Sequence, residues 1–122
     1  MKFLTAVVVV DIQKDFTTAY KGSLAVNGTD HTYLKSACEA TKKLNGVELP
    51  IYATQDWHPA DHVSFASNHK GKKHLETITL EDGRTQILWP DHCVQGTEGA
   101  KLLLDEKLFA GIVKKGTNSK YD

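Results

Sequence analysis

The stretch "AVVVVD" at residues 6–11 is the part of the sequence on which the fold depends. An unbroken run of apolar, mostly β-branched residues predicts a strand buried on both faces, as strands of parallel sheets are. The run ends at Asp11, so this strand carries a carboxylate at its carboxyl end. It is too short to cross a bilayer, and no small-residue cleavage site follows it, so we expect neither a membrane anchor nor a secretory signal.

Downstream of Asp11, the chain alternates between helical and strand-like patterns. Alternation of this kind predicts an α/β fold with a parallel sheet. The expected elements, in chain order, are a loop at residues 17–29, a helix at 30–44, a strand at 51–54 that ends at Gln55 and Asp56, a surface hairpin within 66–87, a helix at 97–111 and a strand at 111–116 that ends near Lys115.

Composition narrows the classes of protein to which the chain can belong. It has 122 residues, 40% hydrophobic and 25% charged, which predicts one globular domain over residues 1–122. Fifteen basic and fifteen acidic residues cancel, so we expect no nucleic-acid or membrane partner. Its two cysteines make no disulfide framework, and the simplest interpretation is a reduced, cytoplasmic protein.

Charged residues follow each of the three expected strands. Asp11, Asp56 and Lys115 should therefore meet at one edge of the sheet, where open parallel sheets bind their ligands. We expect Asp11 and Lys115 to end neighbouring strands, with their side chains within about 4 Å of each other. Asp11 could then act as a general base beside a lysine. The alternatives are that Asp11 caps a turn and that Lys115 is a surface residue.

The loop after the second expected strand has the residue types of a metal site. Asp56 and His58 lie two positions apart, so in an extended segment their side chains point the same way. His92, from a later loop, is a plausible third ligand. One carboxylate and two imidazoles suit zinc, iron or manganese. His62 could be a fourth ligand or could support the ligands. Alternatively, Asp56 caps a turn and the histidines are solvated.

Three further residues beside this polar cluster have two interpretations each. Cys93 adjoins His92, as a nucleophile adjoins its base, but neighbours in sequence rarely face each other, and we expect Cys93 to be a buried structural residue. Phe16 and Trp89 either pack in the core or line a pocket for a flat ring.

Five motifs, taken together and in this order, resemble those of the nicotinamidases of the isochorismatase-like cysteine hydrolase superfamily. They extend over nearly the whole chain, and five in the right order are far more specific than any one alone. The motifs are "VVVDIQKDF" at 8–16, "GSLAV" at 22–26, "TQDWHPADHVSF" at 54–65, "LWPDHCVQGTEGA" at 88–100 and "KKGTN" at 114–118.

The resemblance implies a Rossmann-like three-layer α/β/α fold and a role for individual residues. Asp11 and Lys115 match the catalytic aspartate and lysine, and one divalent ion, most often zinc, is expected. The remaining matches are Asp56, His58 and His92 to the metal ligands, and Phe16, Trp89 and Leu24 to residues around the pyridine ring of the substrate.

The reaction implied is hydrolysis of a linear amide, nicotinamide, to nicotinate and ammonia in NAD salvage, with pyrazinamide accepted too. The nucleophilic cysteine of this family comes after the lysine motif. The resemblance therefore predicts that residues 1–122 are an amino-terminal part, completed by a later segment of the same or a separate chain, and it allows a homo-oligomer. The competing functions are hydrolysis of another small amide by a member of the same superfamily, and non-catalytic binding of a metal or ligand.

Overall fold

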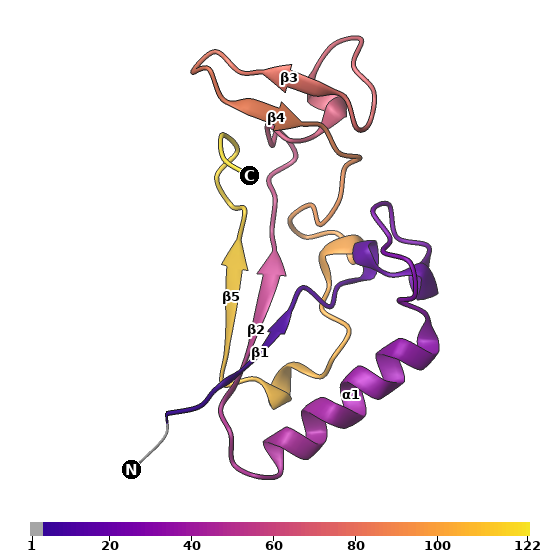
Figure 1. Cartoon of the computed structure of the whole chain (residues 1–122), viewed down its shortest axis with the longest axis vertical. Coiled ribbons are helices and arrows are strands. Elements are labelled where there is room, and N and C mark those ends of the chain that lie inside the picture. Colours follow the sequence, from indigo (N-terminus) through magenta and orange to yellow (C-terminus); the bar gives the residue numbers. More distant parts are fainter. Residues whose placement is uncertain (1–3) are drawn as a thin grey trace.

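A three-stranded parallel sheet lies at the centre of the computed structural model, which describes residues 4–122. Its strands are β1 (Val7–Val10), β2 (Ile51–Asp56) and β5 (Gly111–Lys115), in the order β1-β2-β5. Figure 1 shows the three strands pointing the same way, with one long helix beside them. The predicted α/β class is confirmed in partial form, because within the described residues this helix is the one α-helix that flanks the sheet.

The flanking helix, α1, spans His31–Asn45 and confirms the predicted helix to within one residue at each end. Asp30 caps it, since its side chain accepts a hydrogen bond of 2.8 Å from the backbone N–H of Tyr33. The residues of α1 that are at least partly buried include Leu34, Cys38 and Thr41, which recur at helical spacing.

The two faces of the sheet differ in what covers them. Ile51 and Ala53 of β2 point toward one face and are fully buried. On the opposite face Val8 and Val10 are 57% and 61% exposed. The prediction that the first strand is buried on both faces is therefore wrong for residues 4–122. A continuous apolar run predicts a strand, but it does not show which segments pack against each face of that strand.

The predicted hairpin is confirmed. It consists of β3 (Thr77–Thr79) and β4 (Thr85–Ile87), which pair antiparallel. In Figure 1 the hairpin stands beyond the carboxyl ends of the three parallel strands, apart from α1.

The predicted second helix at 97–111 is wrong. This segment forms two 3₁₀ turns, Glu98–Ala100 and Glu106–Leu108, joined by extended chain. Its backbone bonds to the segment after β1, with Lys14 N–H donating to Lys101 and Leu103 N–H donating to Ile12. These bonds replace those a helix would make within itself. Over residues 4–122, no helix combines the length and the apolar character needed to cross a membrane.

Candidate metal centre and ion-pair cluster

Asp11 is held rigidly where β1 ends. Its φ of +49° is rare for a residue with a side chain, and the chain turns out of the sheet there. The hydroxyl of Thr54 donates to Asp11 Oδ1 at 2.7 Å, and Lys115 Nζ lies 2.8 Å from Asp11 Oδ2. Both carboxylate oxygens therefore have a fixed partner, which orients a candidate base.

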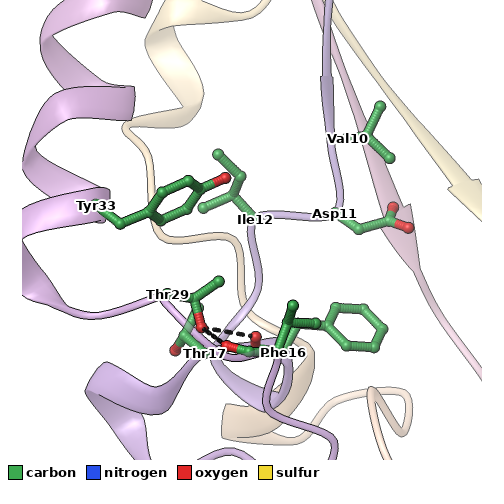
Figure 2. A pocket seen from close by; sticks show the side chains of 8 residues that line it. Val10, Asp11, Ile12, Phe16, Thr17, Thr29 and Tyr33 are labelled. Atoms are coloured by element: carbon green, nitrogen blue, oxygen red, sulfur yellow. Dashed lines mark hydrogen bonds between the residues drawn. The ribbon is translucent and has the colours of Figure 1, made fainter.

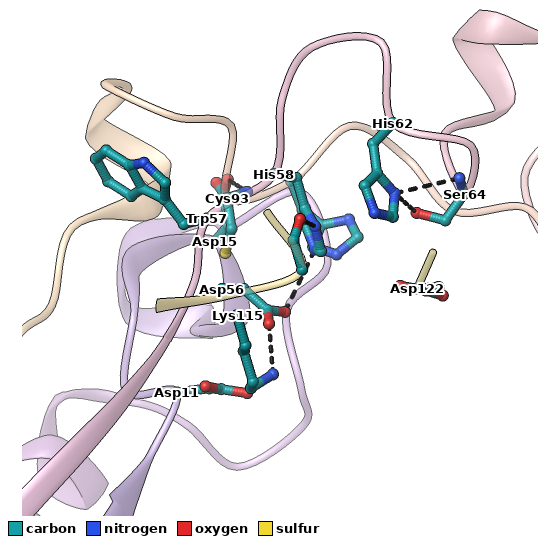
Figure 3. Close-up of polar contacts among 12 residues, drawn as sticks. Asp11, Asp15, Asp56, Trp57, His58, His62, Ser64, Cys93, Lys115 and Asp122 are labelled. Carbon is teal, nitrogen blue, oxygen red and sulfur yellow. Dashed lines mark hydrogen bonds and ion pairs between the residues drawn. The ribbon is translucent and has the colours of Figure 1, made fainter. Parts of the chain in front are cut away.

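Lys115 joins two carboxylates rather than one. Its ammonium also bonds to Asp56 Oδ1, so it lies between Asp11 and Asp56 (Figure 3). The expected approach of Asp11 and Lys115 occurs, but the expectation that they end neighbouring strands is wrong. β2 separates β1 from β5, and Lys115 is paired in register with Asp56. The long lysine side chain reaches Asp11 across the end of β2.

Asp56, His58 and His92 meet as their spacing predicts. One potential ligand atom from each lies within 4.8 Å of the others. His58 and His92 are only 2% and 4% exposed, so neither is a solvated loop residue. The backbone holds the two ligand-bearing loops together, because His58 N–H donates to Cys93 and Gln95 N–H donates to His58.

The ring contacts of both histidines fit a metal. His58 Nδ1 bonds to the carbonyl of Gly116 at 2.9 Å, and His92 Nδ1 bonds to the carbonyl of Pro90 at 2.8 Å. A neutral imidazole that donates from Nδ1 presents the lone pair of Nε2 to a metal. His58 Nε2 is buried, lies 3.5 Å from Asp56 Oδ2 and makes no hydrogen bond, which is costly without a ligand. Three such donors suit zinc, iron or manganese and leave a coordination position open.

His62 lies behind the candidate ligands, not among them. Its ring centroid is 4.3 Å from that of His58, but both of its nitrogens are already bonded. Nδ1 pairs with the hydroxyl of Ser64 at 2.8 Å and Nε2 with the carbonyl of Tyr121 at 2.9 Å. These contacts make His62 a buried support for His58.

The titratable groups of this cluster differ in the direction in which their pKa values are shifted. Burial opposes ionisation of Asp56, but the nearby imidazole of His58 and the ammonium of Lys115 outweigh it and lower the pKa of Asp56 to about 2. Burial also works against the charged form of His58, yet the nearby carboxylate of Asp56 raises the pKa of that imidazole. Burial lowers the pKa of both His62 and His92. A carboxylate and a neutral His92 are the forms that bind metal ions.

Two sets of polar contacts at the site come from residues that the sequence did not single out. Gln13 bonds through its amide to the backbone of Asp56. Asp15 Oδ2 accepts a hydrogen bond of 2.8 Å from the N–H of Cys93, a residue held at a φ of +47° directly after His92. The spacing of Asp11, Gln13 and Asp15 at every second residue was the available signal, but spacing does not reveal such backbone contacts.

The three residues expected around a substrate ring lie in different places. The Phe16 ring lies 5.6 Å from the His92 ring, and with Asp11 it lines a pocket of about 320 Å³ that Tyr33 of α1 borders (Figure 2). Trp89 lines another hollow, beside Arg84 and Asp122. Leu24 is half-buried and is tied by its N–H to the carbonyl of Asp15.

Cys93 is fully buried, as expected of a structural residue. Burial, together with the nearby carboxylate of Asp15, raises the pKa of its thiol. A thiol in these surroundings is a poor nucleophile, because the thiolate is the attacking form.

No protein-family model matches the chain. A nicotinamidase of Acinetobacter baylyi is 44% identical over 119 residues, which cover 96% of this chain and 52% of that protein. Among solved structures, yeast nicotinamidase bound to the inhibitor nicotinaldehyde has a TM-score of 0.80 at 34% identity, over 96% of this chain and 59% of that one. A Pyrococcus horikoshii pyrazinamidase in complex with zinc has a TM-score of 0.72 at 32% identity, over 96% and 54%. The chain thus spans about half the length of the curated relatives it matches.

Proposed function

The chain is a homologue of nicotinamidases over 96% of its residues, and from this premise we propose that the protein containing it hydrolyses nicotinamide to nicotinate and ammonia. The observation that carries the proposal is the joint placement of two sites. A candidate base paired with a lysine lies beside a buried cluster of one aspartate and two histidines, and Asp56 belongs to the cluster while bonding to that lysine. The proposal extends to pyrazinamide and to a place in NAD salvage.

We propose that Asp56, His58 and His92 hold one divalent ion, with zinc the first choice. Support comes from the partnerless Nε2 of His58 and from the likeness to a pyrazinamidase solved with zinc. A bound ion of this kind offers an open position that can orient a ring nitrogen of the substrate. Phe16, which lies against His92, is proposed to pack on the substrate ring, and Trp89 and Leu24 are proposed to complete the pocket.

In the proposed reaction Asp11 moves the protons. It accepts a proton from the attacking thiol and returns it to the amide nitrogen, so that ammonia leaves as the carbon–nitrogen bond breaks. It then accepts a proton from the water that hydrolyses the resulting thioester, and the thiol is restored. Lys115, which lies 2.8 Å from Asp11, favours the thiolate by its positive charge.

The proposal assigns the nucleophile to a residue outside these 122. Cys93 is fully buried, and Cys38 lies in the middle of α1, not at the carboxyl ends of the strands. Residues 1–122 then contribute the base, the lysine and the metal ligands of one domain, and another segment contributes the thiol. Both cysteines of this chain are free, which favours a reducing compartment, and the proposal places the reaction in the cytoplasm.

The test is nicotinate and ammonia production by the complete protein, before and after chelation and zinc replacement. His92→Ala should lose bound metal and most turnover. His74→Ala is the matched control, because His74 is an exposed loop histidine and should change neither. The proposal fails if nicotinamide is not hydrolysed, or if His92→Ala behaves like His74→Ala.

A non-catalytic metal-binding protein is the second candidate, favoured by the burial of Cys93. It predicts stoichiometric metal, lost in His92→Ala, with no turnover of nicotinamide or any other small amide. The same experiment therefore separates the two functions.

A further inference from the structure

The side chain of Gln13 is bonded to both backbone groups of Asp56. Gln13 is fully buried. Its Oε1 accepts from the N–H of Asp56 at 2.8 Å, and its Nε2 donates to the carbonyl of Asp56 at 2.9 Å. The second hydrogen of Nε2 goes to the carbonyl of Ala100 at 2.8 Å. Both N–H groups and the oxygen of the amide thus have partners within the protein.

The place of this amide explains its contacts. β1 leaves the sheet at Asp11, whose carbonyl bonds to the N–H of Gln13 instead of continuing the ladder. Asp56 is the last residue of β2, and the next residue, Trp57, donates its N–H to β5. Because N–H groups alternate sides along a strand, the N–H of Asp56 faces the side that β1 has left. The Gln13 amide fills the place of the missing strand residue there.

We infer that Gln13 is a positioning residue for the metal centre, which acts by fixing the backbone of Asp56. The inference rests on the metal role proposed above for Asp56. That carboxylate has to meet His58, two residues further along, and His92, from another loop, so a small rotation of the strand end would move its oxygens away from the shared focus. Contacts behind metal ligands typically alter metal affinity by 10- to 100-fold when they are removed.

Only an amide of this length can make the contacts. A carboxylate at the same place could accept from the N–H of Asp56 but could not donate to the two carbonyls. A methionine would leave the buried N–H and carbonyl of Asp56 without partners, whereas the carbonyl of Ala100 would keep its bond from Gln55.

Gln55 provides a matched control. It is also a buried glutamine, and its Nε2 donates to the same carbonyl of Ala100, at 2.9 Å. Its side-chain amide makes no bond to the backbone of Asp56. Replacing either glutamine removes one bond to Ala100, so the difference between the two variants isolates the contact with Asp56.

The experiment measures the zinc dissociation constant of the complete protein by chelator competition, and records the visible absorption of its cobalt-loaded form. Gln13→Met should weaken zinc binding about 10- to 100-fold and alter the cobalt spectrum. Gln55→Met should leave both close to wild type while lowering the thermal midpoint. If Gln13→Met does not fold, Gln13→Asn against Gln55→Asn makes the same comparison, because the shortened amide cannot span both groups of Asp56.

Equal zinc affinity and equal cobalt spectra in the Gln13 and Gln55 variants would overturn the inference and leave the proposed metal centre intact. A wild-type protein that binds no zinc would overturn both. The two failures are thus distinguished by the wild-type measurement alone.

Discussion

Lys115 Nζ lies 2.8 Å from Asp11 Oδ2 although a whole strand separates the two residues in the sheet. The lysine crosses the end of β2 and bonds on the way to Asp56, so one ammonium joins the candidate base to a candidate metal ligand. The chemical and metal-binding halves of the site are therefore coupled through a single side chain, and the variants below are chosen to separate them.

Asp11→Asn keeps the shape of the side chain and removes its basicity. We expect kcat to fall by at least about 100-fold, the lower range for general acid–base catalysis. Metal content should stay near wild type, because Asp11 is not among the three candidate ligands. Steady-state kinetics and metal analysis of the complete protein test this. Near-normal turnover would contradict the role of Asp11, and loss of metal in Asp11→Asn but not in Asp56→Asn would mean that the two aspartates have been exchanged.

Lys115→Met should change how the stability of the metal-free protein depends on pH. The lowered pKa of Asp56, about 2, stabilises the native state above the ordinary value of 3.8. This contribution is lost as the pH falls from about 4 to about 2. Without Lys115 the pKa of Asp56 rises, so the variant lacks part of this contribution above about pH 4, and the difference between the two proteins fades as the pH falls toward 2.

The advantage of wild type over Lys115→Met in unfolding free energy should therefore shrink by about 1 kcal/mol between pH 5 and pH 2.5, a value reduced for the partial exposure of the lysine. Denaturant unfolding at several pH values measures it. Lys114→Met is the control, since Lys114 lies over the Trp57 ring and has no part in the ion pairs of Asp56. A difference that does not vary with pH would contradict the ion pair.

The sequence predicted those parts of the site that depend on where strands end. Asp11, Asp56 and Lys115 follow or close three apolar runs, and strand ends of a parallel sheet meet at one edge. It could not predict that β2 lies between Asp11 and Lys115, because strand order is set by packing, not by local pattern. Asp11 and Lys115 still meet although this strand order was not predicted, since a lysine side chain is long enough to reach across one strand.

The helix expected at 97–111 shows a case in which the local sequence pattern predicted the wrong structure. Its residues have helical spacing and an acidic start, but Gly99 packs on Asp15 so closely that a Cβ there would lie 2.0 Å from the carboxylate. The bonds between residues 12–14 and 101–103 then hold this segment in extended chain. Tertiary contacts of this kind override a weak helical preference. The same contacts gave Gln13 and Asp15 roles that no periodicity reveals.

Cys93 should not react with alkylating reagents in the native protein. It is fully buried and the pKa of its thiol is raised, so alkylation by iodoacetamide at pH 8 should occur only after unfolding. Cys93→Ala should retain metal and turnover, with a lower thermal midpoint. Peptide mapping of labelled protein tests this, with the half-buried Cys38 as an internal comparison. Native labelling of Cys93 that abolishes turnover would make it the nucleophile.

Gly116→Ala should damage the metal centre through His58. The carbonyl of Gly116 accepts the bond from His58 Nδ1, and a Cβ on this residue would lie 2.3 Å from His58 Cε1. The φ of +62° at Gly116 also puts an added side chain in left-handed backbone. The imidazole must therefore move, and we expect zinc affinity to fall by at least about tenfold.

Gly28→Ala separates this contact from backbone strain. Gly28 has a φ of +86°, but a Cβ there would meet nothing within 4 Å. Both substitutions force a side chain into left-handed backbone, which costs about 1–2 kcal/mol of stability. Only Gly116→Ala also pushes on a candidate ligand. Chelator competition and thermal unfolding of the two variants should thus show a loss of stability in both and a loss of zinc affinity in Gly116→Ala alone. Equal zinc affinities would mean that the position of His58 does not govern metal binding.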